Sequence, residues 1–238
     1  MVAALIAPTL VAQDISFDPS ITQGEFEQFS RVLGQAFYPS PVAPAGAAGV
    51  LGLDIGIALT AIEVDETAPY WQLSVTEDIL QDGYLPAPRL VVLKGLGRFN
   101  LSGSYFQIPD SDVAVIGATL DLTLSQDGII RPAVGIRGAW SEVRGVDDLD
   151  MRVTGIEVIA SKKFGPLTPW IAYGREMFDA TGRIRLPIPE QELLLTSEIE
   201  DDRISAGVRV SLLLIELAAE AVRHDDVTTW GARVSLSL

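Results

Sequence analysis

The sequence predicts an all-β protein, a transmembrane antiparallel up-and-down β-barrel of about ten strands that follows a short amphipathic helix. Hydrophobic residues make up 48% of the chain and mean hydropathy is +0.29. Yet no uncharged apolar run reaches the roughly 18 residues that a membrane helix needs. Apolar residues instead alternate with polar ones over long stretches, the period of a strand with one apolar face. In a membrane barrel that face meets lipid while the other lines a polar lumen.

The last stretch, residues 228–238, alternates strictly between an apolar face and a polar face. Its apolar positions are Trp230, Ala232, Val234, Leu236 and Leu238, and its polar positions are Gly231, Arg233, Ser235 and Ser237. It resembles the closing strand of bacterial outer-membrane β-barrels, although these usually end on an aromatic residue, most often Phe. The resemblance implies insertion by the barrel-assembly machinery among outer-membrane lipids and lipopolysaccharide.

Residues 1–49 precede the alternating region. Residues 1–13 resemble the apolar core of a secretory signal with cleavage after Ala12, although the basic region is missing, and a plain apolar tail is the alternative. Residues 14–49 combine a helical repeat with the linker PSPVAPAGAAG; the repeat consists of Phe26, Phe29, Leu33 and Phe37. This predicts an amphipathic helix that either plugs the lumen or lies in the periplasm against the barrel rim.

Residues 50–238 form the predicted barrel, and its first four strands follow from alternation. The first begins at Val50 with Leu53, Ile55 and Ile57 outward, and the second is centred on Leu90 and Val92. The third and fourth place alternate residues of 99–105 and 114–124 outward. Asp127-Gly128, the strongest hairpin signal in the chain, follows the fourth.

Six further strands complete the count. The fifth and sixth cover about 134–141 and 154–161, the seventh covers about 167–177 with no assignable facing, and the eighth covers 204–212. After Leu213 the outward parity flips, which indicates a tight hairpin into a ninth strand before the closing tenth. Turns near 95–98, 126–130, 164–166 and 213–214 then share the periplasmic side, and the longer segments 65–87 and 178–202 are outer loops.

Two neighbouring stretches carry a second resemblance. RPAVGIRGAWSEVRGVDDLD and VIASKKFGPLTPWIAYG, at 131–150 and 158–174, look like parts of uncharacterised proteobacterial outer-membrane β-barrel proteins. The resemblance implies a barrel in the bacterial outer membrane and brings no catalytic residues with it.

Charge and composition restrict the partners. The formal net charge of −15 makes nucleic acid a poor partner, and the absence of cysteine excludes disulfides and thiolate metal sites. We expect no cofactor and no dedicated metal site. Acids of the outer loops could still collect divalent cations, or could simply keep the loops solvated: Asp110, Asp112, Asp147, Asp148, Asp150, Glu198, Glu200, Asp201 and Asp202.

The candidate site is the set of charged residues that the alternation turns into the lumen. It comprises Asp54, Asp121, Arg137, Glu157, Arg209, Glu216, Glu220 and Arg233. Isolated buried charges are costly, so these residues are expected to pair. They would form either a salt-bridge network that fills the lumen or the lining of a narrow channel.

Three functions remain open. The first is a non-enzymatic narrow channel or structural membrane protein. The second is a membrane-embedded hydrolase at the barrel mouth using His224, because omptin proteases use an Asp/His pair there; they place Asp two positions before the histidine, where this chain has Val222. The third is a soluble lipocalin-like barrel with its apolar face inward. We expect His224, followed by Asp225 and Asp226, to lie at a water-exposed rim and to be dispensable.

Overall fold

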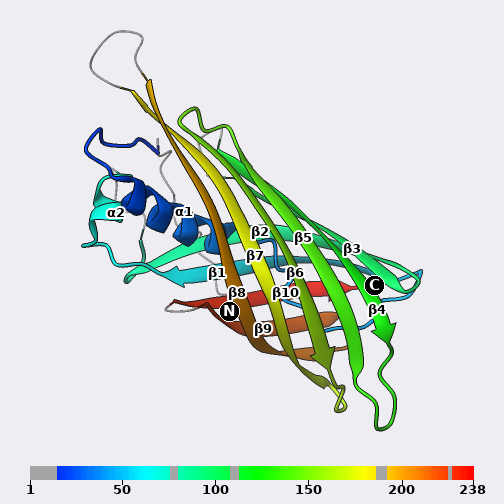
Figure 1. Cartoon of the computed structure of the whole chain (residues 1–238). Coiled ribbons are helices and arrows are strands. Elements are labelled where there is room, and N and C mark those ends of the chain that lie inside the picture. Colours follow the sequence, from blue (N-terminus) through cyan, green and yellow to red (C-terminus); the bar gives the residue numbers. More distant parts are fainter. Residues whose placement is uncertain (1–14, 76–79, 108–112, 186–191, 225–226) are drawn as a thin grey trace, which may run out of the picture.

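A computed structural model describes residues 15–75, 80–107, 113–185, 192–224 and 227–238 (Figure 1). Ten strands form one closed antiparallel barrel in which each strand pairs with its sequence neighbours and β1 pairs with β10. This confirms the predicted fold class. The strands are β1 (Leu53–Glu63), β2 (Tyr84–Leu96), β3 (Phe99–Gln107), β4 (Ala114–Ser125), β5 (Ala133–Arg144), β6 (Leu149–Ser161), β7 (Leu167–Arg185), β8 (Glu192–Leu212), β9 (Ile215–Arg223) and β10 (Thr228–Ser237).

The outer surface of the barrel is apolar where the strands were expected to meet lipid. Ile57 and Ile171 are each 65% exposed, whereas the neighbouring Ala58 and Ala172 are buried inside. The interior carries buried charges, among them Arg137. A soluble ligand-binding barrel has the opposite arrangement, so the lipocalin-like alternative is wrong. No helix among the described residues is long and apolar enough to cross a membrane.

The barrel has two unlike ends. The β2–β3, β4–β5, β6–β7 and β8–β9 connections lie at one end, together with the start of β1 and the finish of β10; we call it the turn end. The other five connections lie at the loop end. The predicted parity flip is confirmed, because Leu213, with φ 56°, makes a tight connection between β8 and β9. The Asp127-Gly128 hairpin is wider than expected, since β4 stops at Ser125 and β5 starts at Ala133.

The expected outer loop at 178–202 is mostly strand. β7 and β8 continue far beyond the apolar belt and pair as far as Arg185 and Glu192, while residues 186–191 lie outside the described residues. The segment 65–87 is likewise more ordered than predicted, because it contains the short helix α2 (Pro69–Gln72) and the start of β2. Glu198, Glu200, Asp201 and Asp202 therefore belong to β8 rather than to a loop.

The helix α1 (Gln23–Phe37) lies in the loop-end mouth (Figure 1). Thr22 caps it in a reciprocal capping box with Glu25, which satisfies two backbone N–H groups at the helix start. Its apolar face, which includes Phe26 and Phe29, joins Trp71 and residues of seven strands in one buried cluster. This cluster seals the mouth above the charged part of the lumen.

Candidate functional site: the barrel lumen

The centre of the lumen holds a chain of buried ion pairs. Arg137 Nε lies 2.7 Å from Asp121 Oδ1, and its Nη1 lies 3.0 Å from Glu157 Oε1. Glu157 also meets Arg203 Nε at 3.3 Å, and Arg203 Nη1 reaches Glu176 Oε1 at 2.9 Å. Asp121, Arg137 and Glu157 are direct cross-strand partners in the β4–β5 and β5–β6 registers. Alternation and register together therefore place these side chains in contact.

Two further pairs lie closer to the turn end. Arg233 Nη2 contacts Asp54, whose other oxygen accepts a hydrogen bond of 3.1 Å from Ser235 Oγ. Arg209 Nη1 lies 3.4 Å from Glu216 Oε2 across the β8–β9 hairpin. The remaining predicted member, Glu220, lies 3.5 Å from Arg203 Nη2 and accepts a hydrogen bond of 2.7 Å from Ser40 Oγ; all eight predicted residues are therefore found inside the barrel.

The sequence analysis missed several interior residues, among them three charged residues and a histidine. Arg89 precedes the part of β2 in which the sequence alternates, and Glu176 lies on β7, for which the sequence did not show which face points inward. Arg203 directly follows residues 178–202, which were predicted to be an outer loop. His224 is the clearest error, because it was expected at a water-exposed rim and is only 3% exposed. It directly follows β9, and its Nε2 lies 3.1 Å from Glu176 Oε2. Asp225 and Asp226 lie outside the described residues.

A polypeptide segment passes through the lumen. After α1, residues 38–49, which we call the threaded segment, run without regular secondary structure from the loop end to the turn end, where β1 begins; the backbone bends at Val42 (φ 47°) and Gly46 (φ 130°). Along residues 37–46, six backbone carbonyl groups accept hydrogen bonds from side chains of the barrel wall. The pairs are Phe37 with Ser141 (2.9 Å), Ser40 with Arg89 (2.7 Å), Pro41 with Arg233 (2.9 Å), Ala43 with Arg137 (3.1 Å), Ala45 with Ser161 (2.9 Å) and Gly46 with Asn100 (2.8 Å).

The composition of this segment suits a narrow lumen. It is built largely of Pro, Ala and Gly, so side chains occupy little space, and each proline removes a backbone N–H that would need a buried acceptor. The Ala48 N–H has its own acceptor, since it donates to Asn100 Oδ1 at 2.9 Å. Tyr38 is the bulky exception, and the Arg203 guanidinium lies 4.5 Å from its ring centroid.

Glycines of the wall leave room for the segment at inward-facing positions. A Cβ added at Gly117 would lie 2.6 Å from Pro39 Cβ, and one added at Gly155 would lie 2.7 Å from the Tyr38 ring. A larger side chain at either position would collide with the segment. The wall thus supplies both the space and the hydrogen-bond donors that this occupant requires.

The acidic residues expected to collect cations are largely paired with arginine. Asp201 faces inward and meets Arg31 of α1 at 3.2 Å, and Arg175 lies between Glu200 and Asp202 on the outer face. Among the described residues no group of three or more His, Asp or Glu side chains could hold a metal ion. Asp110 and Asp112 lie outside the described residues.

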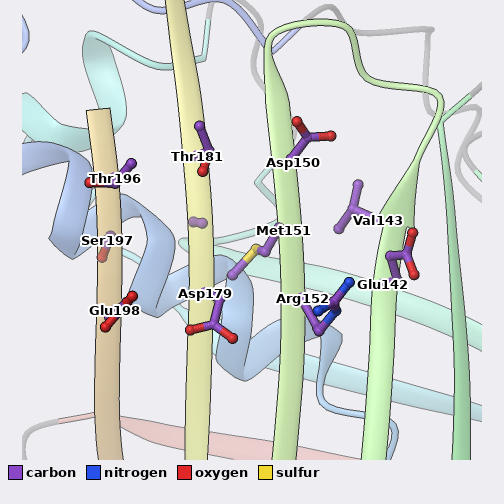
Figure 2. A pocket seen from close by; sticks show the side chains of 11 residues that line it. Glu142, Val143, Asp150, Met151, Arg152, Asp179, Thr181, Thr196, Ser197 and Glu198 are labelled. Carbon is purple, nitrogen blue, oxygen red and sulfur yellow. The ribbon is translucent and has the colours of Figure 1, made fainter. Parts of the chain in front are cut away.

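A shallow cavity of about 510 Å³ lies on the wall formed by β5–β8 beyond the apolar belt. Figure 2 shows carboxylates of Glu142, Asp150, Asp179 and Glu198 around it, with Arg152 among them. At the opposite end, Lys162 donates a hydrogen bond of 2.9 Å to Asp127, which lowers the pKa of that carboxyl group. Neither feature touches the ion pairs of the lumen.

The apolar exterior, the charged interior and the closed strand order define a transmembrane β-barrel. No family model and no curated protein matches the sequence. Solved structures of similar shape include the KdgM porin (13% identity, TM-score 0.37, covering 79% of this chain and 99% of that one). They also include the N-terminal β-barrel domain of Pseudomonas aeruginosa OprF (12%, 0.34, 78% and 97%) and Neisserial surface protein A (8%, 0.28, 78% and 96%). At these values the likeness carries no argument about function, which rests on the residues of this chain.

Proposed function

We propose that the protein is a bacterial outer-membrane barrel whose lumen is closed by its own residues 15–49, so that it passes small solutes only while this segment is displaced. The observation that carries the proposal is the set of six backbone carbonyls held by wall donors. Each such bond contributes about 0.5–1.5 kcal/mol net, and those donated by arginine about 1.5–3 kcal/mol. Displacement of the segment is therefore a costly and infrequent event.

The membrane and the orientation are supported by the outer surface. Phe99 and Phe164 are exposed near the turn end, and Tyr105 and Trp230 are exposed near the loop end, which gives two aromatic girdles around an apolar belt. Short turns face the periplasm in such barrels and longer connections face outward. The lipid partners are accordingly outer-membrane lipids with lipopolysaccharide at the loop end, and the barrel-assembly machinery inserts the chain.

A disulfide lock tests the closure. A Cβ at Gly135 would lie 3.8 Å from Ala45 Cβ, and disulfides require about 3.5–4.5 Å between these atoms. The chain contains no cysteine, so Ala45→Cys/Gly135→Cys introduces a single bridge between segment and wall. We expect the oxidised protein to show no openings in planar bilayers and the reduced protein to show brief ones.

The single variants Ala45→Cys and Gly135→Cys serve as matched controls, and heat-dependent gel mobility checks that each barrel is folded. Conductance of the oxidised double variant equal to that of the reduced one would contradict closure by the segment. If neither form conducts under voltage, the protein is a structural membrane barrel rather than a channel.

The hydrolase alternative receives no support from the site. A catalytic histidine must be able to reach the substrate. The His224 side chain is buried: its Nε2 contacts Glu176, which itself is fully buried, and its Nδ1, although it has no hydrogen-bond partner, is buried as well.

A further inference from the structure

The direction of the threaded segment fixes where the N-terminal part of the chain emerges. The sequence of wall contacts starts at Phe37, beside α1 in the loop-end mouth, and finishes at Ala48, beside the start of β1 at the turn end. Upstream of α1, residues 17 and 18 still lie at the loop end. The Asp18 N–H donates to Leu73 O at 2.9 Å, just after α2, and the Phe17 ring contacts Phe26 and Phe29.

We propose that this barrel carries its own N-terminal part across the membrane through its lumen and anchors it at the outer surface. The proposal uses the orientation given under the proposed function, but it does not depend on whether the lumen ever conducts. The protein then acts as an anchor that displays residues 15–37 outside the cell.

A single passage through the barrel is sufficient for this. A fully extended chain advances roughly 3.3 Å per residue, so residues 38–49 cover at most about 40 Å, which leaves length for the bends at Val42 and Gly46 in crossing the roughly 30 Å hydrocarbon core of a bilayer. A plug that entered from the periplasm and returned there would need two passages. The glycines and donors of the wall accommodate one backbone segment, and six carbonyl groups along it accept hydrogen bonds from the wall.

The anchor at the outer end is strong. Arg31 and Gln35 of α1 both reach Asp201 of β8, at 3.2 Å and 3.3 Å. Gly34 packs so closely on Phe178 that an added Cβ would overlap the ring. The apolar face of α1 is buried against the barrel wall and α2, while residues such as Gln28 face solvent. The helix thus holds the displayed part at the mouth.

Labelling of single cysteines in intact cells tests the proposal. Gln28→Cys reports on α1, Glu66→Cys on the loop end through the exposed β1–β2 connection, and Gln126→Cys on the turn end through the exposed β4–β5 connection. With a membrane-impermeant maleimide we expect Gln28→Cys and Glu66→Cys to be labelled to the same extent in intact cells. Gln126→Cys should be labelled only after the outer membrane is permeabilised.

Two outcomes would overturn the proposal, and they can be told apart. Labelling of Gln28→Cys only after permeabilisation, together with Gln126→Cys, would place α1 in the periplasm and contradict display. Labelling of Gln126→Cys in intact cells with protection of Glu66→Cys would show an inverted barrel, in which case the orientation itself fails. All three sites are exposed, and heat-dependent gel mobility confirms that each variant is assembled. The Ala45→Cys/Gly135→Cys variant tests closure of the lumen in a separate experiment.

Discussion

Replacement of Arg137 by Met should destabilise the barrel more than any change of a surface charge. The guanidinium is 2% exposed and donates to Asp121, to Glu157 and to the Ala43 carbonyl, so it joins two strands of the wall to the threaded segment. Removal of one partner from a buried ion pair costs roughly 3–5 kcal/mol, because an unpaired charge remains. Glu157 retains Arg203, so the unpaired charge falls on Asp121 and we expect about 3 kcal/mol.

The assay is urea-induced unfolding in lipid vesicles, followed by tryptophan fluorescence and by heat-dependent gel mobility. Arg175→Met is the matched control, because Arg175 also lies between two carboxylates, Glu200 and Asp202, but on the solvent-exposed outer face. Solvent screens exposed pairs, so this variant should unfold like the parent protein. Asp121→Asn added to Arg137→Met should recover part of the lost stability. Equal effects of Arg137→Met and Arg175→Met would refute the argument that burial makes the lumen pairs essential.

The remaining predictions concern facing, threading and the buried histidine. Val208→Arg, on the outer face near the middle of the apolar belt, should lower the free energy of unfolding by roughly 2–4 kcal/mol in an unfolding titration. Ser205→Ala, on the inner face, should leave it nearly unchanged. Equal losses of stability in the two variants would mean that the inward and outward faces are wrongly assigned. Asn100→Ala removes both side-chain bonds to the segment near the turn end, so channel openings should become more frequent in planar bilayers, and an unchanged frequency would contradict the closure. His224→Ala should lower the temperature at which the unboiled band disappears on gels, because Glu176 loses a buried partner; an unchanged temperature would show that the contact is unimportant.

The sequence predicts which residues of a strand point outward wherever the outer face of that strand contacts lipid. In β4 and β10 alternation extends over the whole strand, and the assigned faces are confirmed by burial. The cross-strand contacts of Arg137 follow from the same alternation once the β4–β5 and β5–β6 registers are known. Strand period thus identifies which residues line the lumen, but only register tells which of them meet.

Alternation failed where the polarity of the two faces is exchanged within one strand. In the membrane part of β8, Ile204 and Val208 face outward, whereas beyond it Leu195 and Ile199 face inward, against the cluster that surrounds α1. The parity of the strand never changes, but the apolar residues move from the lipid face to the buried mouth, and acids such as Glu198 take the outer positions. A search for alternating lipid-facing residues therefore finds only the membrane part of β8. The rest of β8 then resembles an acidic loop.

The threaded segment could not be placed from the sequence because the properties that admit it to the lumen are those of a linker. Proline, alanine and glycine in residues 39–49 indicate a flexible connection when considered alone. The wall residues that hold the segment are distant in the sequence, and nothing in the sequence distinguishes them. Ser141, Ser161 and Asn100 are ordinary polar lumen positions, and Gly117 is one glycine among many. Only the closed barrel places these donors and gaps opposite the carbonyl groups of one backbone segment. Because the wall provides its donors to the protein's own backbone, the lumen of this barrel is better understood as a binding site for a polypeptide than as an empty pore.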